Sequence, residues 1–270
     1  MASEPTPAPE TVSADVALTV AGTRLEATVT VATAPARLVE MLPLFQSLAD
    51  RVIGAVVASV EAQGRTISCR KGCGACCRQL VPISEVEARR IRDLVEGLPE
   101  PRRATIKARF EEARRRLDEA GLLEILRHPD RSSAARRHSL GMDYFALRIA
   151  CPFLDEESCS IHRDRPVACR EYLVTSPAAH CANPTEETIE GVMMPAPIWP
   201  TLARVEGRPT EPGPLRWVPL ILAPEWADAH PDEAAPRPGP EWVRAIFERL
   251  CGEPVPAPAP GLMGLPGSSG

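Results

Sequence analysis

The sequence predicts a mostly α-helical fold with a small N-terminal β-hairpin and an irregular, Pro-rich C-terminal region. Apolar residues recur at helical spacing in several stretches, whereas strict apolar–polar alternation is confined to the N-terminal end. Thirty prolines, about twice the usual share, argue against regular structure in much of the C-terminal part. Neither an internal repeat nor an alternation of strands and helices is visible, so a parallel sheet is not expected.

The N-terminal part, residues 15–66, is expected to form a hairpin followed by a helix. Residues 1–14 are polar and rich in proline and are expected to be disordered. Apolar residues alternate on both sides of Ala21–Thr23, which indicates the turn of a β-hairpin. Pro43 fits the first turn of a helix that runs to about Ala62, because proline is tolerated there. The predicted buried stripe of this helix is Phe45, Leu48, Val52, Val56 and Val60.

Two further helices are predicted after the first cluster of cysteines. Ser84 and Glu87 form a Ser-x-x-Glu capping box that opens the first of them. Pro101 begins the second, whose apolar positions recur at steps of three and four residues. The other face of this second helix carries basic residues among several acids: Arg102, Arg103, Lys107, Arg109 and Arg114–Arg116. We interpret that face as a solvated surface with internal ion pairs, with a surface for an acidic partner as the alternative.

The C-terminal part, residues 183–251, is expected to be a Pro-rich extension that ends in a helix. Twelve prolines lie between positions 195 and 240. Within this stretch, Trp217–Trp226 is apolar enough to cover the core as an extended segment. The apolar spacing predicts a last helix over Trp242–Leu250, followed by a disordered Pro/Gly tail over residues 252–270.

Charge and composition argue against several classes of protein function. A net charge of −5 argues against a general nucleic-acid binder, which is normally basic. The N-terminus lacks the basic start and apolar run of a signal peptide, and the longest apolar run, Val52–Val60, is too short to span a bilayer. We therefore expect a cytoplasmic protein with no membrane partner. In that reducing compartment, clustered cysteines indicate metal ligands or redox chemistry rather than structural disulfides.

The first cysteine run spans Cys69–Cys77 and reads CRKGCGACC, with four thiols in nine residues. Its two glycines permit the tight turns that bring successive sulfurs inward. Arg70, Lys71 and Arg78 surround the thiols, where core packing would require apolar neighbours. Such cations also favour the thiolate form that binds metals. We interpret this run as a metal-binding loop.

The second cysteine run spans Cys151–Cys169 and reads CPFLDEESCSIHRDRPVAC. Asp164 can cap a helix with Pro166 in its first turn, which would place the last cysteine of the run one turn inside that helix. A further cysteine follows after a predicted loop. The candidate metal ligands are therefore two groups of four thiols along the chain, in a metal-binding domain over residues 67–182: Cys69, Cys73, Cys76, Cys77, Cys151, Cys159, Cys169 and Cys181.

The adjacent residues Cys76 and Cys77 bear on the number of metal positions. Neighbouring side chains diverge, so both thiols rarely bind one tetrahedral ion. Either one thiol is spare or there are two metal positions. Eight thiolates match two four-thiolate sites, which zinc and iron–sulfur clusters accept equally. The spacing thus predicts a metal-stapled core and leaves zinc and iron–sulfur both open.

The pattern CxxxCxxCC, followed by CPFL-x₄-C-x-I-H-x-x-RP-x-x-CR, resembles the YkgJ-type cysteine-cluster family. That family is described as zinc- or iron-chelating and includes bacterial flagellin lysine N-methylases. The resemblance covers about residues 69–181. It implies metal chelation by the cysteines of both runs, and by Cys181 at a position whose spacing varies in the family. One departure is His162, where relatives often have Tyr.

Residues near the last cysteine of the second run complete the candidate site. Arg165 and Arg170 are predicted to contact the cofactor by donating to thiolates or inorganic sulfide, with surface salt bridges as the alternative. His162 is either a metal ligand or a surface histidine that fills an aromatic position, and we favour the second. Cys251 stands alone at the end of a helix and is interpreted as a buried hydrophobic residue outside the site.

Two other functions compete with a metal-binding protein whose centre is structural or serves metal handling. The first is a lysine N-methylase-like enzyme with a protein substrate, S-adenosylmethionine and an iron–sulfur cluster. Its support is the spacing of Cys69, Cys73 and Cys76, which matches the three-cysteine signature of radical S-adenosylmethionine enzymes. Against it, Ala75 replaces the usual aromatic residue, and the strand–helix units of their barrel are missing from the sequence. The second is a zinc-stiffened module that displays the basic helix to a protein partner. We favour the metal-binding protein.

Overall fold

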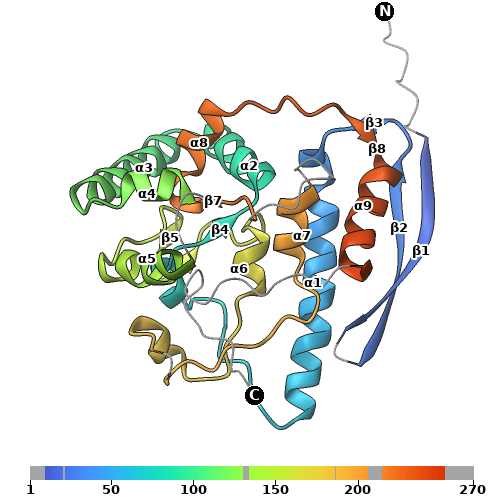
Figure 1. Ribbon diagram of the computed structural model, residues 1–270, viewed down its shortest axis with the longest axis horizontal. Coiled ribbons are helices and arrows are strands. Elements are labelled where there is room, and N and C mark those ends of the chain that lie inside the picture. The colour runs from blue at the N-terminus through green and yellow to red at the C-terminus, as the bar shows by residue number, and fades with distance from the viewer. Residues whose placement is uncertain (1–9, 21, 130–133, 186, 206–214, 253–270) are drawn as a thin grey trace, which may run out of the picture.

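The fold is mostly helical with a two-stranded hairpin at its N-terminal end, as predicted (Figure 1). The computed structural model describes residues 10–20, 22–129, 134–185, 187–205 and 215–252. The helices are α1 (Leu38–Ala62), α2 (Glu85–Glu96), α3 (Arg102–Glu119), α4 (Leu123–Arg127), α5 (Ala134–Ala146), α6 (Val167–Glu171), α7 (Ile198–Val205), α8 (Ala223–Ala229) and α9 (Gly239–Gly252). The 3₁₀ turns η1 (Ala75–Arg78), η3 (Ala178–Ala182) and η4 (Leu220–Leu222) lie between these helices.

The strands form four antiparallel pairs. β1 (Thr11–Val20) and β2 (Thr23–Ala32) make the long hairpin, with Leu18 opposite Leu25. The remaining pairs have two residues per strand: β3 (Pro35–Ala36) with β8 (Arg237–Pro238), β4 (Pro82–Ile83) with β7 (Val218–Pro219), and β5 (Leu154–Asp155) with β6 (Ser158–Cys159). These short pairs bring together segments that are distant in the chain.

The hairpin begins earlier than the sequence predicted. Thr11–Ala14 belong to β1 and pair with the end of β2, so the expected disorder is wrong for these residues. Polar cross-strand contacts contribute there, for example Ser13 Oγ with Thr30 Oγ1 at 2.8 Å. The expectations for residues 1–9 and for the tail beyond Gly252 lie outside the described residues.

Helix α1 also begins about one turn earlier than predicted, at Leu38. The backbone N–H of Arg37 donates to Glu40 Oε2 over 2.6 Å, which closes the start of the helix as a capping box does. Pro43 therefore lies inside the helix rather than in its first turn. The predicted stripe is correct, because Phe45, Val52, Val56 and Val60 are buried and Leu48 is partly buried.

Helix α1 runs through the middle of the molecule and organises the main core. α6, α7, α9 and the hairpin all contact it, with α9 and the hairpin along one side (Figure 1). One cluster of buried apolar residues extends from Val20 in β1 to Ile246 in α9. Val167 and Ala168 of α6 belong to the same cluster. The N-terminal and C-terminal parts thus pack together around α1, and α6, which carries Cys169, packs into the same core.

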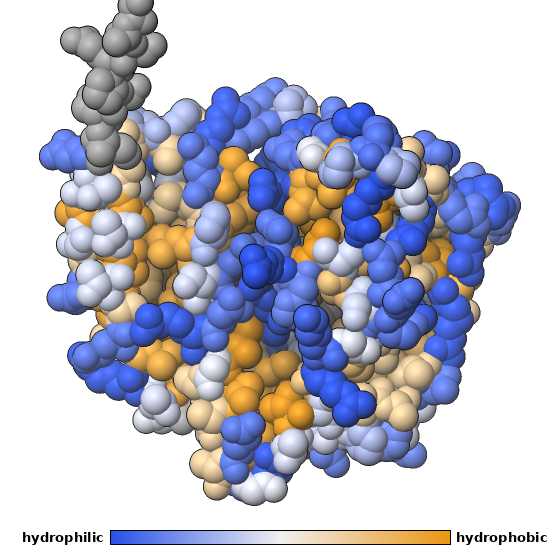
Figure 2. All heavy atoms as spheres, turned by 180° about the vertical axis from the view of Figure 1, so that it is seen from behind, coloured by the Kyte–Doolittle hydropathy of each residue, from blue (hydrophilic) through white to orange (hydrophobic). Residues whose placement is uncertain are grey.

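By length and composition, α1 is also the one described helix that is apolar enough to cross a membrane. The sequence reading missed this because it counted only an uninterrupted apolar run. Core helices of soluble proteins pass the same test, and here the buried stripe of α1 packs into the main core. On the face seen in Figure 2, hydrophobic side chains reach the surface in separate areas with hydrophilic side chains between them.

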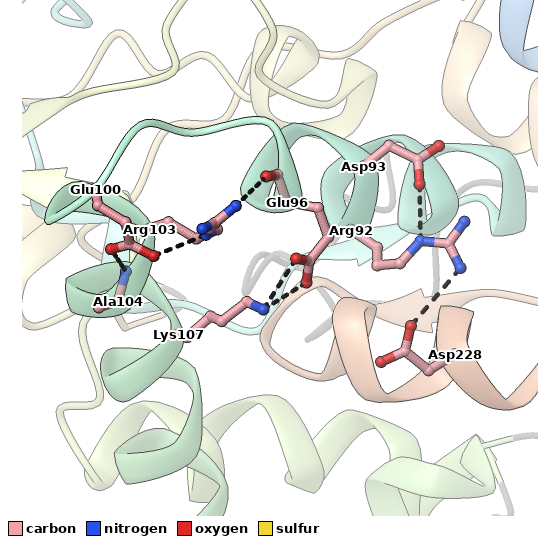
Figure 3. Close-up of polar contacts among 8 residues, drawn as sticks. All are labelled: Arg92, Asp93, Glu96, Glu100, Arg103, Ala104, Lys107 and Asp228. Carbon is pink, nitrogen blue, oxygen red and sulfur yellow. Dashed lines mark hydrogen bonds and ion pairs between the residues drawn. The ribbon is translucent and has the colours of Figure 1, made fainter.

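Helices α2, α3 and α8 form a second group, joined by ion pairs at its surface. The capping box of α2 is present as predicted, with Glu87 N donating to Ser84 Oγ. Figure 3 shows Lys107 of α3 paired with Glu96 of α2, and Arg92 of α2 reaching Asp228 of α8. Each Arg and Lys of α3 either forms an ion pair with an acidic side chain or donates to a carbonyl oxygen of this chain. The interpretation of the basic face as a surface with internal ion pairs is confirmed.

The C-terminal part contains more helix than its prolines suggested. Trp217–Trp226 covers the core, as predicted, but it does so mainly through η4 and α8 rather than as an extended segment. Proline is compatible with these helices because it lies near their starts, at Pro200 in α7, Pro224 in α8 and Pro240 in α9.

Candidate metal centre

The loop of the first cysteine run is folded by two consecutive turns. The Cys73 N–H donates to the Arg70 carbonyl at 3.1 Å, and Gly72 within this turn has φ +84°. Glycine suits that left-handed conformation because it carries no Cβ. The Cys77 N–H then donates to the Gly74 carbonyl at 3.0 Å and starts η1. The two glycines that the sequence singled out therefore lie at these turns.

The second cysteine run forms the β5–β6 hairpin and the start of α6. Glu156 and Glu157, the turn residues of the hairpin, have φ 46° and 57°. Two positive φ values fit a type I′ turn, which is strained for residues other than glycine or asparagine. Arg78 holds this turn, because its guanidinium donates to both carboxylate oxygens of Glu157 at 2.6 and 3.0 Å. The same guanidinium donates to the Gly74 carbonyl at 3.1 Å, so it joins both runs.

Gly74 packs directly on the β5–β6 hairpin. A Cβ at this position would lie 2.6 Å from Leu154 Cδ1 and 3.0 Å from Glu157 Cα. Because backbone cannot give way as a flexible side chain can, only glycine fits between the two runs here. This contact is the reason for glycine at position 74, because its φ of −97° is open to any residue.

All eight candidate thiols line a single cavity of about 230 Å³: those of Cys69, Cys73, Cys76, Cys77, Cys151, Cys159, Cys169 and Cys181. The two cysteine runs therefore converge in space, as the ligands of one metal centre must. Arg70, Lys71, His162, Arg165 and Arg170 line the same cavity, together with Tyr172. A water molecule occupies about 30 Å³ in the liquid. The cavity is several times larger than this, so it has room for more than one small ion.

The sulfurs stand along the cavity wall rather than at one point. Within the described residues, no three His, Cys, Asp or Glu side chains form a group that could hold an ion as they stand. All nine cysteines are free thiols. Neutral thiols do not attract one another, so ligation requires them to turn toward a common centre.

Burial and mutual proximity raise the pKa of six of these thiols. Burial is the largest cause for Cys151, with a pKa of about 12, and for Cys181, with a pKa of about 11. The pKa of Cys76 is raised chiefly by its contact with the Cys77 side chain and then by burial. Burial likewise raises the pKa values of Cys69, Cys159 and Cys169. Without metal, these groups therefore remain protonated at neutral pH.

The same thiols receive hydrogen bonds that favour their ionised form. Backbone N–H groups of Val174, Phe153 and Ile161 donate to the sulfurs of Cys69, Cys151 and Cys159, respectively, and lower their pKa values. N–H donors to sulfur are a usual feature of thiolate metal sites. Arg165 adds a buried Nε that has no hydrogen-bond partner. The donor set therefore fits metal-bound thiolates better than neutral core cysteines.

Residues 68–189 match the model of the CxxCxxCC family, described as “Putative zinc- or iron-chelating domain”. The match includes all eight thiols of the cavity. This agrees with the resemblance found in the sequence, and the family description speaks of chelation rather than methyl transfer. Comparison with curated proteins and with solved structures gave no match.

Within the CxxCxxCC domain, the two predicted arginines have different surroundings. Arg170 is buried, and its guanidinium donates to both carboxylate oxygens of Asp50 in α1 at 2.8 and 3.0 Å. It also donates to the carbonyl oxygens of Arg163 and Arg165. Arg170 thus fixes α6 to α1 and holds the preceding loop, although it borders the cavity. Arg165 is the arginine with a buried donor still available there.

The helix that carries Cys169 is capped differently from the prediction. Its N-cap residue is Pro166, and Asp164 pairs with Arg90 instead. The Val167 N–H donates to Glu87 Oε1 at 2.7 Å, so a fully buried carboxylate from α2 satisfies the helix start. Burial raises the Glu87 pKa. Only the capping-box pattern pointed to Glu87, and it gave no sign of this second contact.

Three more residues refine the site. His162 borders the cavity with its side chain exposed, and burial of the ring followed by the nearby Arg165 lowers its pKa. Cys251 does not line the cavity, but it is exposed rather than buried as predicted. Tyr172, which the sequence analysis did not single out, lines the cavity and accepts a 3.3 Å hydrogen bond from Gln79 Nε2. Its one signal was its place two residues after Arg170.

Proposed function

We propose that the protein binds zinc or an iron–sulfur cluster in the eight-thiol cavity and that this centre stabilises its fold. One observation carries the proposal: the thiols of two runs separated by more than seventy residues line the same cavity. Core cysteines have no reason to gather around an open space lined by four cationic side chains. Metal ligands do.

Charge supports the presence of more than one metal ion. Eight thiolates around one divalent ion would leave a large uncompensated negative charge in a partly buried site, which is costly. Two divalent ions, or cluster cores of the same charge, would neutralise half of it. Arg70, Lys71 and Arg165 at the cavity offset much of the remainder. The size of the cavity is consistent with such a polynuclear centre.

A structural role for the metal follows from the loops that the centre would connect. The loops that carry the thiols contain little regular structure, and only a small apolar cluster lies around Cys181. Metal–thiolate bonds would therefore supply much of their cohesion, as in other metal-stabilised modules. Storage or transfer of the metal is the second role we keep open, because the cavity borders exposed residues such as Arg70 and Lys71.

A methylase-like activity receives less support. Cofactor binding to a cluster needs an iron with an open position, and eight thiolates would saturate two four-coordinate sites. We keep S-adenosylmethionine, a protein substrate and a protein partner as alternatives outside the proposal. The free thiols of this chain suit the cytoplasm, where we place the protein.

The test is metal analysis of the full chain purified without oxygen. A brown sample with a broad absorption band near roughly 400 nm, together with iron and acid-labile sulfide, would assign an iron–sulfur centre. A colourless sample with stoichiometric zinc would assign zinc. The Cys251→Ser variant is the control for non-specific thiol binding and should retain its metal. A protein that binds neither metal stoichiometrically after anaerobic reconstitution would contradict the proposed function.

A further inference from the structure

In space, the thiols form two groups that do not coincide with the two cysteine runs. Cys181 lies in a small apolar cluster with Val174 and Ile189, and Cys69 packs against the same cluster. The turn that ends at Cys73 returns the chain beside Arg70, the residue that follows Cys69. Cys181, the last of the eight candidate ligands along the chain, therefore joins the first two.

The other group consists of all three thiols of the second run. Cys151, Cys159 and Cys169 all pack against one apolar cluster built around Ile83, Phe153 and Ile161. Cys159 is paired with Leu154 in the β5–β6 hairpin, and Cys169 lies in α6. This gives three thiols on each side of the cavity.

The adjacent pair Cys76–Cys77 lies between the two groups. Both residues are in η1, which contacts η3 and hence the turn that holds Cys181. On the other side, the Cys77 carbonyl accepts a 2.7 Å hydrogen bond from the Cys151 N–H. A 3₁₀ helix has three residues per turn, so successive side chains point about 120° apart. The backbone thus directs the two side chains to different sides, although the two thiols are in contact without metal. The pair can serve two neighbouring ions once each thiol turns toward its own ion.

We infer that the cavity has two four-thiolate positions, one formed by Cys69, Cys73 and Cys181 and the other by Cys151, Cys159 and Cys169. Each position is completed by one thiol of the Cys76–Cys77 pair. This assignment rests on the proposed metal-binding function and specifies how the ligands are divided. It also makes the two positions interdependent. The first position needs Cys181, which follows the second run in the chain, and η1 supplies one thiol to each position.

The ligand sets can be read by cadmium NMR on the full chain, stripped of metal and reloaded with NMR-active cadmium. Two signals from sites rich in thiolate are expected for the wild type. Cys73→Ser and Cys181→Ser should shift or remove the same signal, and Cys151→Ser and Cys169→Ser should affect the other. Cys76→Ser and Cys77→Ser should each act on a different signal. Cys251→Ser serves as the matched control and should leave both signals in place.

The outcomes separate this assignment from the proposed function. Failure of the wild type to bind cadmium, zinc or iron stoichiometrically would contradict metal binding itself. Two bound ions with Cys181→Ser and Cys169→Ser acting on one signal would overturn the division, because the ligands would then follow chain order. If Cys76→Ser alters both signals, the Cys76 thiolate bridges the two ions, and the assignment of one thiol of the pair to each position is wrong. Where a ligand variant gives broad signals, native mass spectrometry checks the result. Such a variant should bind about half of the cadmium that the wild type binds.

Discussion

The backbone N–H of Cys151 donates to the carbonyl oxygen of Cys77 over 2.7 Å. This bond joins the last cysteine of the first run to the first cysteine of the second. Arg78 strengthens the junction through its contacts with Glu157 and with the Gly74 carbonyl. The two runs are therefore held together by backbone and ion-pair contacts even before a metal is considered.

Gly74→Ala should disturb this junction. The added methyl group would lie 2.6 Å from Leu154 Cδ1 and 3.0 Å from the Glu157 backbone, so the hairpin has to move. Overpacking of this kind costs about 1–3 kcal/mol. We expect a lower melting temperature and reduced metal content. Gly54→Ala in α1 is the matched control, because a Cβ there meets no atom within 4 Å and alanine favours helices. Equal behaviour of the two variants would exclude the close contact.

Removal of single ligands should lower metal content and stability together. Cys73→Ser and Cys169→Ser each remove one thiol from the cavity, whereas Cys251→Ser removes a thiol outside it. Structural zinc contributes roughly 10–16 kcal/mol in small domains, so the loss of one position should lower the melting temperature by many degrees. Metal analysis and thermal unfolding of the three variants provide the measurement. Full metal content and an unchanged melting temperature in Cys73→Ser would show that Cys73 is not a ligand.

Metal affinity should increase with pH. The thiols of Cys151 and Cys181, with pKa values of about 12 and 11, are protonated at neutral pH and must lose their protons to bind metal. Each proton released at the point of binding adds up to a tenfold gain in affinity per pH unit. Chelator competition with zinc at pH 6, 7 and 8 measures this gain. An affinity that does not change over this range would mean that these thiols are not ligands.

The buried carboxylate of Glu171 predicts a second pH effect, on stability. It accepts the backbone N–H of Ile198 at 2.5 Å at the start of α7, and burial raises its pKa to about 8. Because the folded-state pKa exceeds that of the unfolded chain, its contribution is fully present below about pH 4.5 and is lost as pH rises to about 8. The slope is at most about 1.4 kcal/mol per pH unit.

Glu171→Gln removes that titration while keeping one acceptor oxygen. The difference in unfolding free energy between wild type and variant, measured by urea unfolding from pH 6 to pH 9, should fall toward pH 8 and then level off. Taking the difference cancels the pH dependence of the metal centre, which both proteins share. Parallel pH profiles would show that the Glu171 carboxyl titrates normally.

The fold class was predictable from local patterns, and the thiols of the cavity were predictable from the spacing of cysteines within each run. The period of the apolar residues indicated α1, α2, α3 and α9, and the Ser84–Glu87 box marked the start of α2. The division of the thiols was not predictable. It depends on Cys181 packing beside Cys69, a contact between distant segments that no spacing rule gives. The helical form of Trp217–Trp226 was missed for a different reason. Its prolines argued against a helix, but Pro224 lies at the start of α8, where proline is tolerated.

Arg165 and Arg170 looked equivalent in the sequence, and the structure predicts that their substitution has different effects. Arg170 donates to Asp50 and to two carbonyl oxygens, so Arg170→Met should destabilise the fold by leaving those acceptors without a partner. Arg165 has a buried, unpartnered Nε at the cavity, so Arg165→Met should change the centre more than the fold.

Two measurements on the same samples separate these effects. Urea unfolding should show a larger loss for Arg170→Met, on the order of 1–3 kcal/mol. The absorption spectrum of the bound metal, or of cobalt in place of zinc, should shift mainly in Arg165→Met, because a lost donor to sulfur alters the metal–thiolate bond. Arg163→Met is the control, since its side chain is exposed and does not line the cavity. A spectral shift in Arg170→Met equal to that in Arg165→Met would mean that both arginines donate to sulfur at the metal centre, as the sequence suggested.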